Sequence, residues 1–361
     1  MGFARETCVS SGPRNSRCWE LAQSEVAKGW VGTPQVVDID GLLNVIMSPR
    51  FCILEQHGTQ APKFRSVECL AKSRANLLTE LVDTYRPQRH DYLLALCRLL
   101  AKHGAEGLEM WSLDFPNACK AIPVRPRSDD VANVVFANPG DGKAYRARVL
   151  VRPFGSCSAP ENWGRLITCV QELAMRLFRL HLGAYVDDVF TGEPSTYALS
   201  GFVAFKKIAR LLGLPTADRE DQRPAETIRV LGAVATVSSN SLTVCADEKR
   251  KYDNVEPTDE ASASGMLTPA GAGKIRGELG FLASLSFGEV GWSLLAPLAK
   301  RQYAVGTRAL TFERRTCLER RRRQLPDLAP MFAPYDFRFV SERILTRRAA
   351  ATPRQRSGEM G

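Results

Sequence analysis

The 361-residue sequence lacks the features that mark zinc-binding, secreted and membrane-spanning proteins. Its ten cysteines include no C-x-x-C pair and only four histidines could assist them, which argues against a zinc site. Its most apolar stretch, Leu93 to Leu100, is too short to cross a bilayer, so we expect no membrane partner. Residues 1–30 show no secretory signal. Unpaired cysteines without a signal fit a reducing compartment, and we expect the cytoplasm or nucleus.

Internal repeats and a regular alternation of strands and helices are also missing. Apolar residues at helical spacing predict helices over 69–83, 90–103, 159–181, 196–212 and 272–299. Strand patterns cover 110–113, 131–136, 145–151, 182–191, 228–237 and 242–246, with a strong turn signal at 138–142. Residues 1–45 show no clear periodicity and are predicted to form an irregular extension. Because strands and helices mix without βαβ order, the expected fold class is α+β.

The basic excess is confined to the C-terminal end. The formal net charge is +10, and residues 300–361 contribute +9 of it with 15 basic and six acidic residues. This tail could track phosphates, or it could be a self-repelling stretch, because residues 347–356 lack the apolar spacing needed for packing. The rest of the chain is nearly neutral, so its function must be inferred from motifs.

Two adjacent carboxylates give the sharpest local motif. Asp187 and Asp188 lie between two short apolar runs in Ala-Tyr-Val-Asp-Asp-Val-Phe, which predicts a hairpin with both acids at its tip. An Asp-Asp pair is also ordinary turn chemistry. A carboxylate pair held on a sheet is nevertheless what Mg²⁺ needs, since this ion takes one or two carboxylates together with substrate phosphates.

A third carboxylate, Asp114, ends the strand predicted at 110–113. It could simply cap a helix. If its strand neighbours the hairpin in one antiparallel sheet, Asp114 and Asp187 can converge on a pair of metal ions, which would stabilise both oxygens of an in-line phosphoryl displacement.

Between these sites, residues 152–160 read Arg-Pro-Phe-Gly-Ser-Cys-Ser-Ala-Pro. This bend opens a helix, and its backbone N–H groups could meet a nucleotide or a template strand.

Together these motifs resemble those of reverse transcriptases. Three segments occur in the order seen in that family: Asp114 with the following Asn-Ala-Cys-Lys at 117–120, the Pro-Phe-Gly-x-x-x-Ala-Pro segment, and Tyr-Val-Asp-Asp. The chain is most similar to Ty3-type and DIRS-type retrotransposon enzymes over about residues 46–305. The resemblance implies a right-hand fold. Its parts are the fingers, an antiparallel palm sheet backed by helices, and a thumb. The resemblance assigns 46–255 to fingers and palm, 256–305 to a thumb-like helical region and 306–361 to an Arg-rich tail.

The resemblance implies an RNA-directed DNA polymerase that transfers a nucleotidyl group from a dNTP to a primer 3′-hydroxyl. Asp114, Asp187 and Asp188 would hold two Mg²⁺ ions, or Mn²⁺. Lys63 and Arg65, which on their own fit a solvated basic pair, would neutralise the triphosphate. The remaining implied contacts are Phe115, Cys119, Phe154 and Gly155 for the nucleotide, and Tyr185, Leu231 and Gly232 for an RNA or DNA template–primer. The residues do not indicate an oligomeric state.

The chain departs from the family at several positions. Cys119 stands where an aromatic side chain usually screens out the ribose 2′-hydroxyl, so sugar selection is expected to be looser. Arg152 replaces the usual leucine before Pro-Phe-Gly, and the acidic cluster of a ribonuclease H domain is missing. Cys119, the missing nuclease cluster and the Arg-rich tail favour an alternative, in which the protein is a catalytically decayed, retroelement-derived nucleic-acid-binding protein. The three intact carboxylates oppose this alternative.

Overall fold

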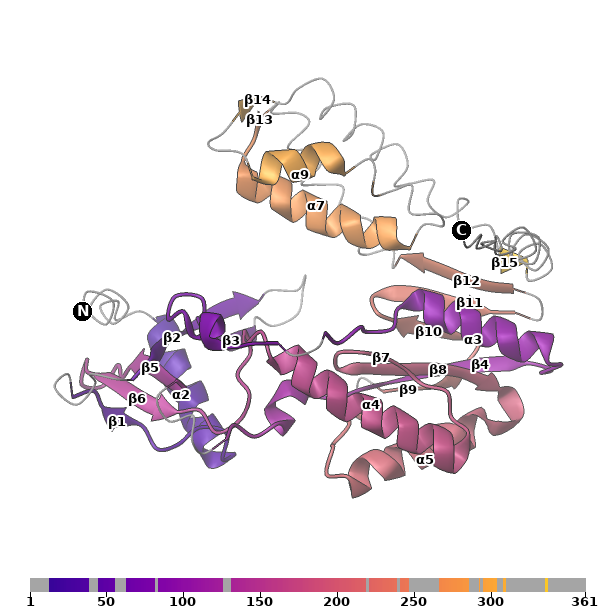
Figure 1. The fold of residues 1–361 in the computed structure, drawn as a ribbon, viewed down its shortest axis with the longest axis horizontal. Helices are drawn as coiled ribbons and strands as arrows, with labels where there is room; N and C mark the ends of the chain where they lie inside the picture. The colour runs from indigo at the N-terminus through magenta and orange to yellow at the C-terminus, as the bar shows by residue number, and fades with distance from the viewer. Residues whose placement is uncertain are drawn as a thin grey trace, which may run out of the picture. The chain divides into compact units, whose positions relative to one another are not determined.

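The protein consists of two compact units, each assembled from segments that are distant in the sequence (Figure 1). The computed structural model describes residues 13–38, 45–55, 63–81, 84–125, 131–218, 221–238, 241–246, 266–285, 292, 295–303, 308–309 and 335–336. The first unit comprises Met1–Pro87, Phe115–Leu177 and Ala209–Thr216. The second comprises Gln88–Asp114, Phe178–Ile208 and Ala217–Gly361.

A five-stranded sheet of order β1-β6-β5-β2-β3 forms the base of the first unit. Its strands are β1 (Gln35–Val36), β2 (Met47–Glu55), β3 (Lys63–Glu68), β5 (Asn133–Ala137) and β6 (Ala144–Arg148). β2 and β5 run parallel, and the other neighbours run antiparallel. The predicted turn between β5 and β6 is confirmed: Asn138 N donates to Lys143 O at 3.0 Å, and its side chain accepts from Gly140 N.

A helix, α2 (Pro13–Ala27), occupies the segment predicted to be irregular, so that prediction was wrong. Cys18 and Ala22, one turn apart, are buried in a core that includes Phe136, and Trp19 packs edge-on against Tyr145. The apolar stripe of α2 is narrow and is surrounded by polar residues. Its helical spacing is therefore weak in the sequence, and packing on the sheet stabilises the helix.

Three further helical elements belong mainly to the first unit: η1 (Ala75–Leu78), η2 (Ala118–Ala121) and α4 (Ala159–Phe178). The helix predicted over 159–181 is confirmed as α4, whose inward face carries Trp163, Ile167, Val170 and Ala174. The helix predicted over 69–83 was wrong. Arg74 has a left-handed φ of 60°, which interrupts helical geometry, and turns with the single short helix η1 replace it.

The second unit contains the antiparallel sheet β7-β8-β4-β9. Its strands are β4 (Leu108–Asp114), β7 (Gly183–Tyr185), β8 (Asp188–Pro194) and β9 (Gln222–Ala225). The helices predicted over 90–103 and 196–212 are confirmed as α3 (His90–Lys102) and α5 (Ser195–Leu211). Successive residues of β4 point to opposite faces of the sheet, and each face packs on one helix. Met110 packs in the core that contains Leu93 of α3, whereas Trp111 contacts Phe202 and Phe205 of α5. The sheet is therefore covered on both faces.

A second sheet in this unit has the order β10-β11-β12-β15. Its strands are β10 (Thr227–Val230), β11 (Ala233–Val237), β12 (Ser241–Ala246) and β15 (Tyr335–Asp336). The single strand predicted over 228–237 is a hairpin, because Leu231 and Gly232 have left-handed φ values of 49° and 74°. Positive φ at both central residues is the mark of a type I′ turn, which reverses the chain in two residues.

The remaining described elements are β13 (Met266–Leu267), α7 (Pro269–Ser284), α9 (Ala296–Gln302) and β14 (Arg308–Ala309). The helix predicted over 272–299 is divided between α7 and α9, which share a core with Ile275, Leu279 and Leu298. Most of the Arg-rich tail predicted over 306–361 lies outside the described residues. None of the helices in the described part of the chain has the length and apolar composition required to cross a bilayer.

Candidate functional site

The carboxylates predicted to be catalytic lie at one end of the β7-β8-β4-β9 sheet. Asp114, the last residue of β4, is the direct cross-strand partner of Asp188, the first residue of β8. Residues opposite each other in an antiparallel pair project from the same face, with Cβ atoms about 4.5–5.5 Å apart, and like charges there destabilise the sheet. The register therefore gathers negative charge at a cost in stability.

Asp187 lies in the two-residue turn, Val186–Asp187, that joins β7 to β8. Val186 has a left-handed φ of 51°. Two-residue hairpins need positive φ at the first turn position, where glycine is unstrained, whereas a β-branched side chain costs on the order of 1–3 kcal/mol. The sequence thus keeps a strained residue immediately beside the two aspartates.

These carboxylates fit a magnesium ion in part. Mg²⁺ prefers oxygen ligands and commonly uses one or two carboxylates, completing its shell with water and substrate phosphates. Asp114 and Asp188 supply two carboxylates on one face. Within the described ranges, no group of three His, Cys, Asp or Glu side chains is placed to hold a metal ion. Asp187 therefore does not complete a closed three-carboxylate site, and the paired aspartates fit an ion that takes its other ligands from substrate and water.

The tip of the β10–β11 hairpin is the second strained turn of this unit. Leu231 adopts a left-handed φ that is unfavourable for its side chain, and Gly232 follows it. His90, buried at the start of α3, has its Nε2 atom 2.9 Å from the carbonyl oxygen of Val230, so Nε2–H donates. Burial lowers the pKa of His90, and the bond to Val230 opposes this only in part. His90 thereby holds the strand residue that precedes the turn.

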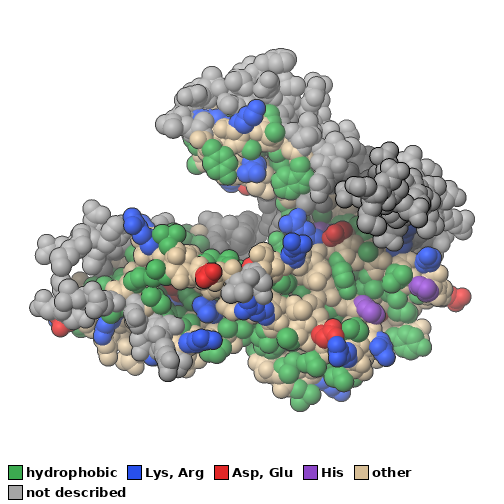
Figure 2. Space-filling view, in the orientation of Figure 1, with side chains coloured by type: hydrophobic (Ala, Val, Ile, Leu, Met, Phe, Trp, Pro, Cys, Tyr) green, Lys and Arg blue, Asp and Glu red, His purple; other side chains and the backbone are tan. Residues whose placement is uncertain are grey.

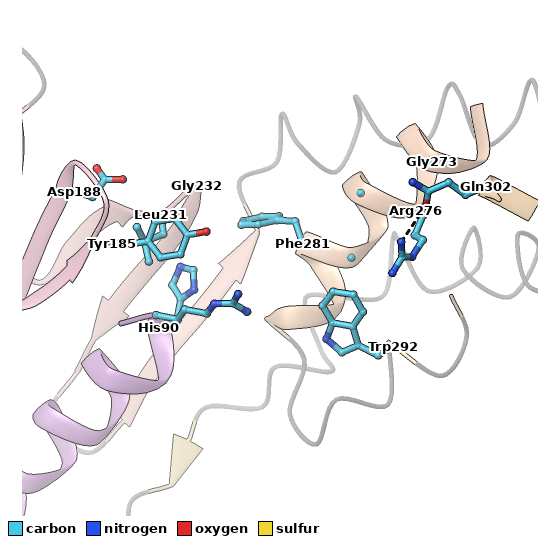
Figure 3. Close-up of a pocket in the computed structure, with 13 residues that line it drawn as sticks. His90, Tyr185, Asp188, Leu231, Gly232, Gly273, Arg276, Phe281, Trp292 and Gln302 are labelled. Carbon is cyan, nitrogen blue, oxygen red and sulfur yellow. Dashed lines mark hydrogen bonds between the residues drawn. The ribbon is translucent and has the colours of Figure 1, made fainter. Parts of the chain in front are cut away.

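The β10–β11 tip lines a pocket of about 700 Å³ together with Tyr185 and Asp188, the strand residues on either side of the β7–β8 turn. Figure 3 shows Tyr185, Leu231 and His90 on one side, and Phe281, Trp292 and Arg276 on the other. Aromatic faces can stack on bases, and arginines can bind phosphates. The chemistry of this pocket therefore suits a nucleic-acid strand.

The α7 side of the pocket presents backbone and a fixed arginine. Gly273, Gly277 and Gly280 recur at helical spacing, so they form a face without side chains. Arg276 donates from Nη1 to Gln302 Oε1 at 2.9 Å. The Gln302 side chain covers Gly273 and the Trp292 ring covers Gly280, where an added Cβ would lie 3.3 Å and 3.2 Å from them, whereas Gly277 has open space beside it. A strand could therefore approach the α7 backbone at Gly277, beside the positioned guanidinium group of Arg276.

The basic residues predicted to bind the triphosphate belong to the first unit. Lys63 and Arg65 lie two positions apart on β3, so they project from the same face of the strand, and both are exposed. On the face of the molecule that Figure 2 shows, the described Lys and Arg side chains are scattered and do not gather into one patch. Lys63 and Arg65 are therefore a local feature of β3.

Two predicted nucleotide contacts are buried. Phe115 is 2% exposed, and its ring centroid lies 5.5 Å from that of Trp163. Cys119, in η2, is 6% exposed. Neither side chain is presented at the surface of the structure, so the sugar-selecting role implied for Cys119 stays a prediction.

The Phe154–Gly155 loop is exposed and is held by a residue far away in sequence. Gly155 has a φ of 92°, and a Cβ atom there would lie 3.1 Å from the carbonyl oxygen of Glu68, so the position requires glycine. Asn76 donates from Nδ2 to Gly155 O at 2.9 Å and accepts at Oδ1 from Cys157 N at 3.1 Å. One amide group thus clamps both sides of the loop.

A buried ionic cluster in the first unit joins four separate elements. Arg50 of β2 forms ion pairs with Glu25 of α2 and Glu68 of β3, and Glu25 also pairs with Lys120 of η2. Burial alone would raise the pKa of Glu25, but Arg50 and Lys120 outweigh burial and hold it below its ordinary value. With two cations and two carboxylates, the cluster is electrically balanced.

Asn76, His90 and Lys120 have contacts that sequence patterns do not reveal. Their partners lie 79, 140 and 95 positions away along the chain. In the sequence, each of these three residues is only a polar residue within an apolar or turn-forming stretch. Such residues are common in any protein, so this pattern does not identify their contacts. Their positions follow only from the fold.

Comparison with known proteins identifies the fold through solved structures. One similar structure is a foamy viral protease–reverse transcriptase, designated dRH, in complex with double-stranded DNA; its TM-score is 0.60 at 15% identity, covering 87% of this chain and 48% of that chain. Another is the foamy viral protease–reverse transcriptase in complex with an RNA/DNA hybrid, with a TM-score of 0.56 at 16% identity over 86% of this chain and 37% of that one. No protein-family model and no curated protein sequence matches. The chain has a reverse transcriptase-like fold of mixed helices and sheets, and it spans less than half the length of these neighbours.

Proposed function

We propose that the protein is an RNA-directed DNA polymerase of the retrotransposon type, similar to Ty3-type and DIRS-type enzymes. The observation that carries this proposal is the β4–β8 register, which places Asp114 opposite Asp188 beside the strained Val186–Asp187 turn. Accumulating like charge on paired strand positions is unfavourable for folding, so it calls for a functional reason. Cations that bind a nucleotide provide one.

The solved structures support the nucleic-acid part of the proposal. The foamy viral proteins that share the fold are complexes with double-stranded DNA and with an RNA/DNA hybrid. The proposed layout assigns residues 46–255 to fingers and palm and 256–305 to a thumb. Tyr185, Leu231 and Gly232 would contact a template–primer, because all three line the pocket of the second unit.

Asp114 and Asp188, with Asp187 beside them, would hold Mg²⁺, with Mn²⁺ as a substitute. When bound, two such ions supply charge stabilisation to the attacking and leaving oxygens of a phosphoryl displacement. The residues of the first unit would serve the dNTP. Lys63 and Arg65 would neutralise its triphosphate, and the loop of Phe154 and Gly155 would shape its pocket, with Phe115 and Cys119 in support.

Primer extension on an RNA template with Mg²⁺ tests the proposal. Wild-type protein should extend the primer, and Asp188→Asn should abolish extension while retaining template binding. Asp141→Asn is the matched control, because Asp141 lies in an exposed turn of the first unit and an asparagine can keep its bond from Lys143 N. Extension that survives Asp188→Asn, or wild-type protein that extends no primer, would overturn the polymerase assignment.

The second candidate function is nucleic-acid binding without polymerisation. The observation that favours it is that the three aspartates do not form a three-ligand metal group among the described residues. In that case the wild-type protein and Asp188→Asn would bind a template–primer equally, and neither would extend it. The same assay therefore separates the two functions.

A further inference from the structure

Lys120 is a buried lysine next to the proposed nucleotide pocket. It follows Cys119 in η2, and only 7% of its surface is exposed. An ammonium group is costly to remove from water, so lysine is almost never this buried unless it is paired. Its place in the fold therefore depends on specific partners.

Three side chains surround the Lys120 ammonium. Nζ forms an ion pair with Glu25. It also lies 4.7 Å from the ring centroid of Trp30 and 5.4 Å from that of Phe154. Both distances fall within the range of about 6 Å over which a cation is attracted to an aromatic face. The ammonium thus links the N-terminal segment to the Phe154–Gly155 loop.

Phe154 is the partner whose orientation matters for function. Its side chain is 40% exposed, so packing on apolar neighbours alone leaves much of the ring open to solvent. Asn76 holds the backbone of the loop through Gly155 and Cys157 but does not bind the ring. A contact from Lys120 to the ring supplies the missing constraint.

We propose that Lys120 is a positioning residue that sets the Phe154 ring for dNTP binding, an inference that rests on the proposed polymerase function. Glu25 of α2 and Trp30, which follows α2, hold the ammonium in place. The N-terminal helix thereby becomes part of the support of the nucleotide pocket, although it lies outside residues 46–305, which carry the sequence motifs that resemble reverse transcriptases.

The chain offers a matched control in Lys28. Its Nζ atom also lies 4.7 Å from the Trp30 ring centroid, but the residue is exposed. Lys28→Met therefore removes the same charge and a contact of the same length to the same ring. It leaves Glu25 and Phe154 with Lys120.

Steady-state primer extension with the full chain tests the role of Lys120. Lys120→Met should raise the KM for dNTP on the order of fivefold with little change in kcat, as expected for loss of a cation–π contact that positions a binding group. Lys120→Arg should recover most of this loss, since a guanidinium also stacks on aromatic rings. Lys28→Met should leave both constants unchanged.

Phe154→Leu tests the same contact without disturbing the Lys120–Glu25 pair, and so covers the case in which Lys120→Met does not fold. It should raise the KM by a similar factor. Unchanged KM in Phe154→Leu, or equal KM shifts in Lys120→Met and Lys28→Met, would overturn the inference while wild-type activity keeps the proposed function standing. Wild-type protein that extends no primer would instead overturn the proposed function.

Discussion

The two units arrange charged side chains in opposite ways. In the first unit, Arg50 and Lys120 balance Glu25 and Glu68 within one buried cluster. In the second unit, the β4–β8 register sets Asp114 directly opposite Asp188, which gathers charge of one sign. The first arrangement stabilises the junction of four elements, whereas the second works against its own sheet. The cluster therefore has a structural role, and the proposed function would account for the aspartates through the binding of metal ions.

The largest expected effect is on the balanced cluster. Arg50→Met should lower the free energy of unfolding by about 3–5 kcal/mol, because the Glu68 carboxylate and part of the Glu25 charge lose their buried partner. Urea denaturation at pH 7 measures this change. Arg17→Met is the control, since Arg17 makes an exposed pair with Glu20 on α2 and should change stability by less than about 0.5 kcal/mol. Equal losses in the two variants would contradict a structural role for the cluster.

The next effect separates activity from stability in the second unit. Asp188→Asn should reduce primer extension at least about 100-fold, the equivalent of several kcal/mol of charge stabilisation. Its thermal unfolding midpoint should stay the same or rise, because the variant removes a like charge opposite Asp114. A parallel fall of activity and of the unfolding midpoint would mean that Asp188 supports the fold.

A smaller effect concerns the strained hairpin tip. Val186→Gly should raise the free energy of unfolding by up to about 1 kcal/mol, because glycine accepts the φ of 51° without strain. Leu231→Gly should act in the same direction at the β10–β11 tip, where φ is 49°. Chemical denaturation of both variants tests this. A loss of stability in both would show that side-chain packing outweighs backbone strain.

The last effect is gradual and concerns the response of the two units to acid. Burial lowers the pKa of His90 from its ordinary 6.5, so the unfolded chain takes up a proton there before the folded protein does. Stability from neutral His90 is complete above pH 6.5 and declines below it, by at most about 1.4 kcal/mol per pH unit. Glu25, whose pKa is held below 4.5, keeps its contribution until the pH falls under that value.

Unfolding measured between about pH 7 and 5 should therefore show a slope that His90→Gln removes and that Glu25→Gln leaves in place. Below pH 4.5, the Glu25→Gln variant should lose part of the wild-type slope. If His90→Gln leaves the slope above pH 5 intact, another group carries it. That result would contradict the prediction that the two units lose stability in different pH ranges.

Local sequence patterns were sufficient for α3, α4, α5 and the β7–β8 hairpin. Each depends on contacts between residues close in the chain, so apolar spacing and turn residues predict it. The same reasoning placed Asp187 and Asp188 at a hairpin and Asp114 at a strand end. It failed for α2 and for 69–83, where packing on the sheet and a left-handed Arg74 override the local pattern.

By itself the sequence determined which residues carry charge, turn chemistry and apolar faces, because these properties belong to short segments. The tertiary structure alone decided that Asp114 faces Asp188, that Asn76 clamps the loop of Gly155, and that Lys120 lies between Glu25 and Phe154. These pairs join residues that are far apart in the chain. Their proximity follows from sheet register and core packing, which no local pattern encodes.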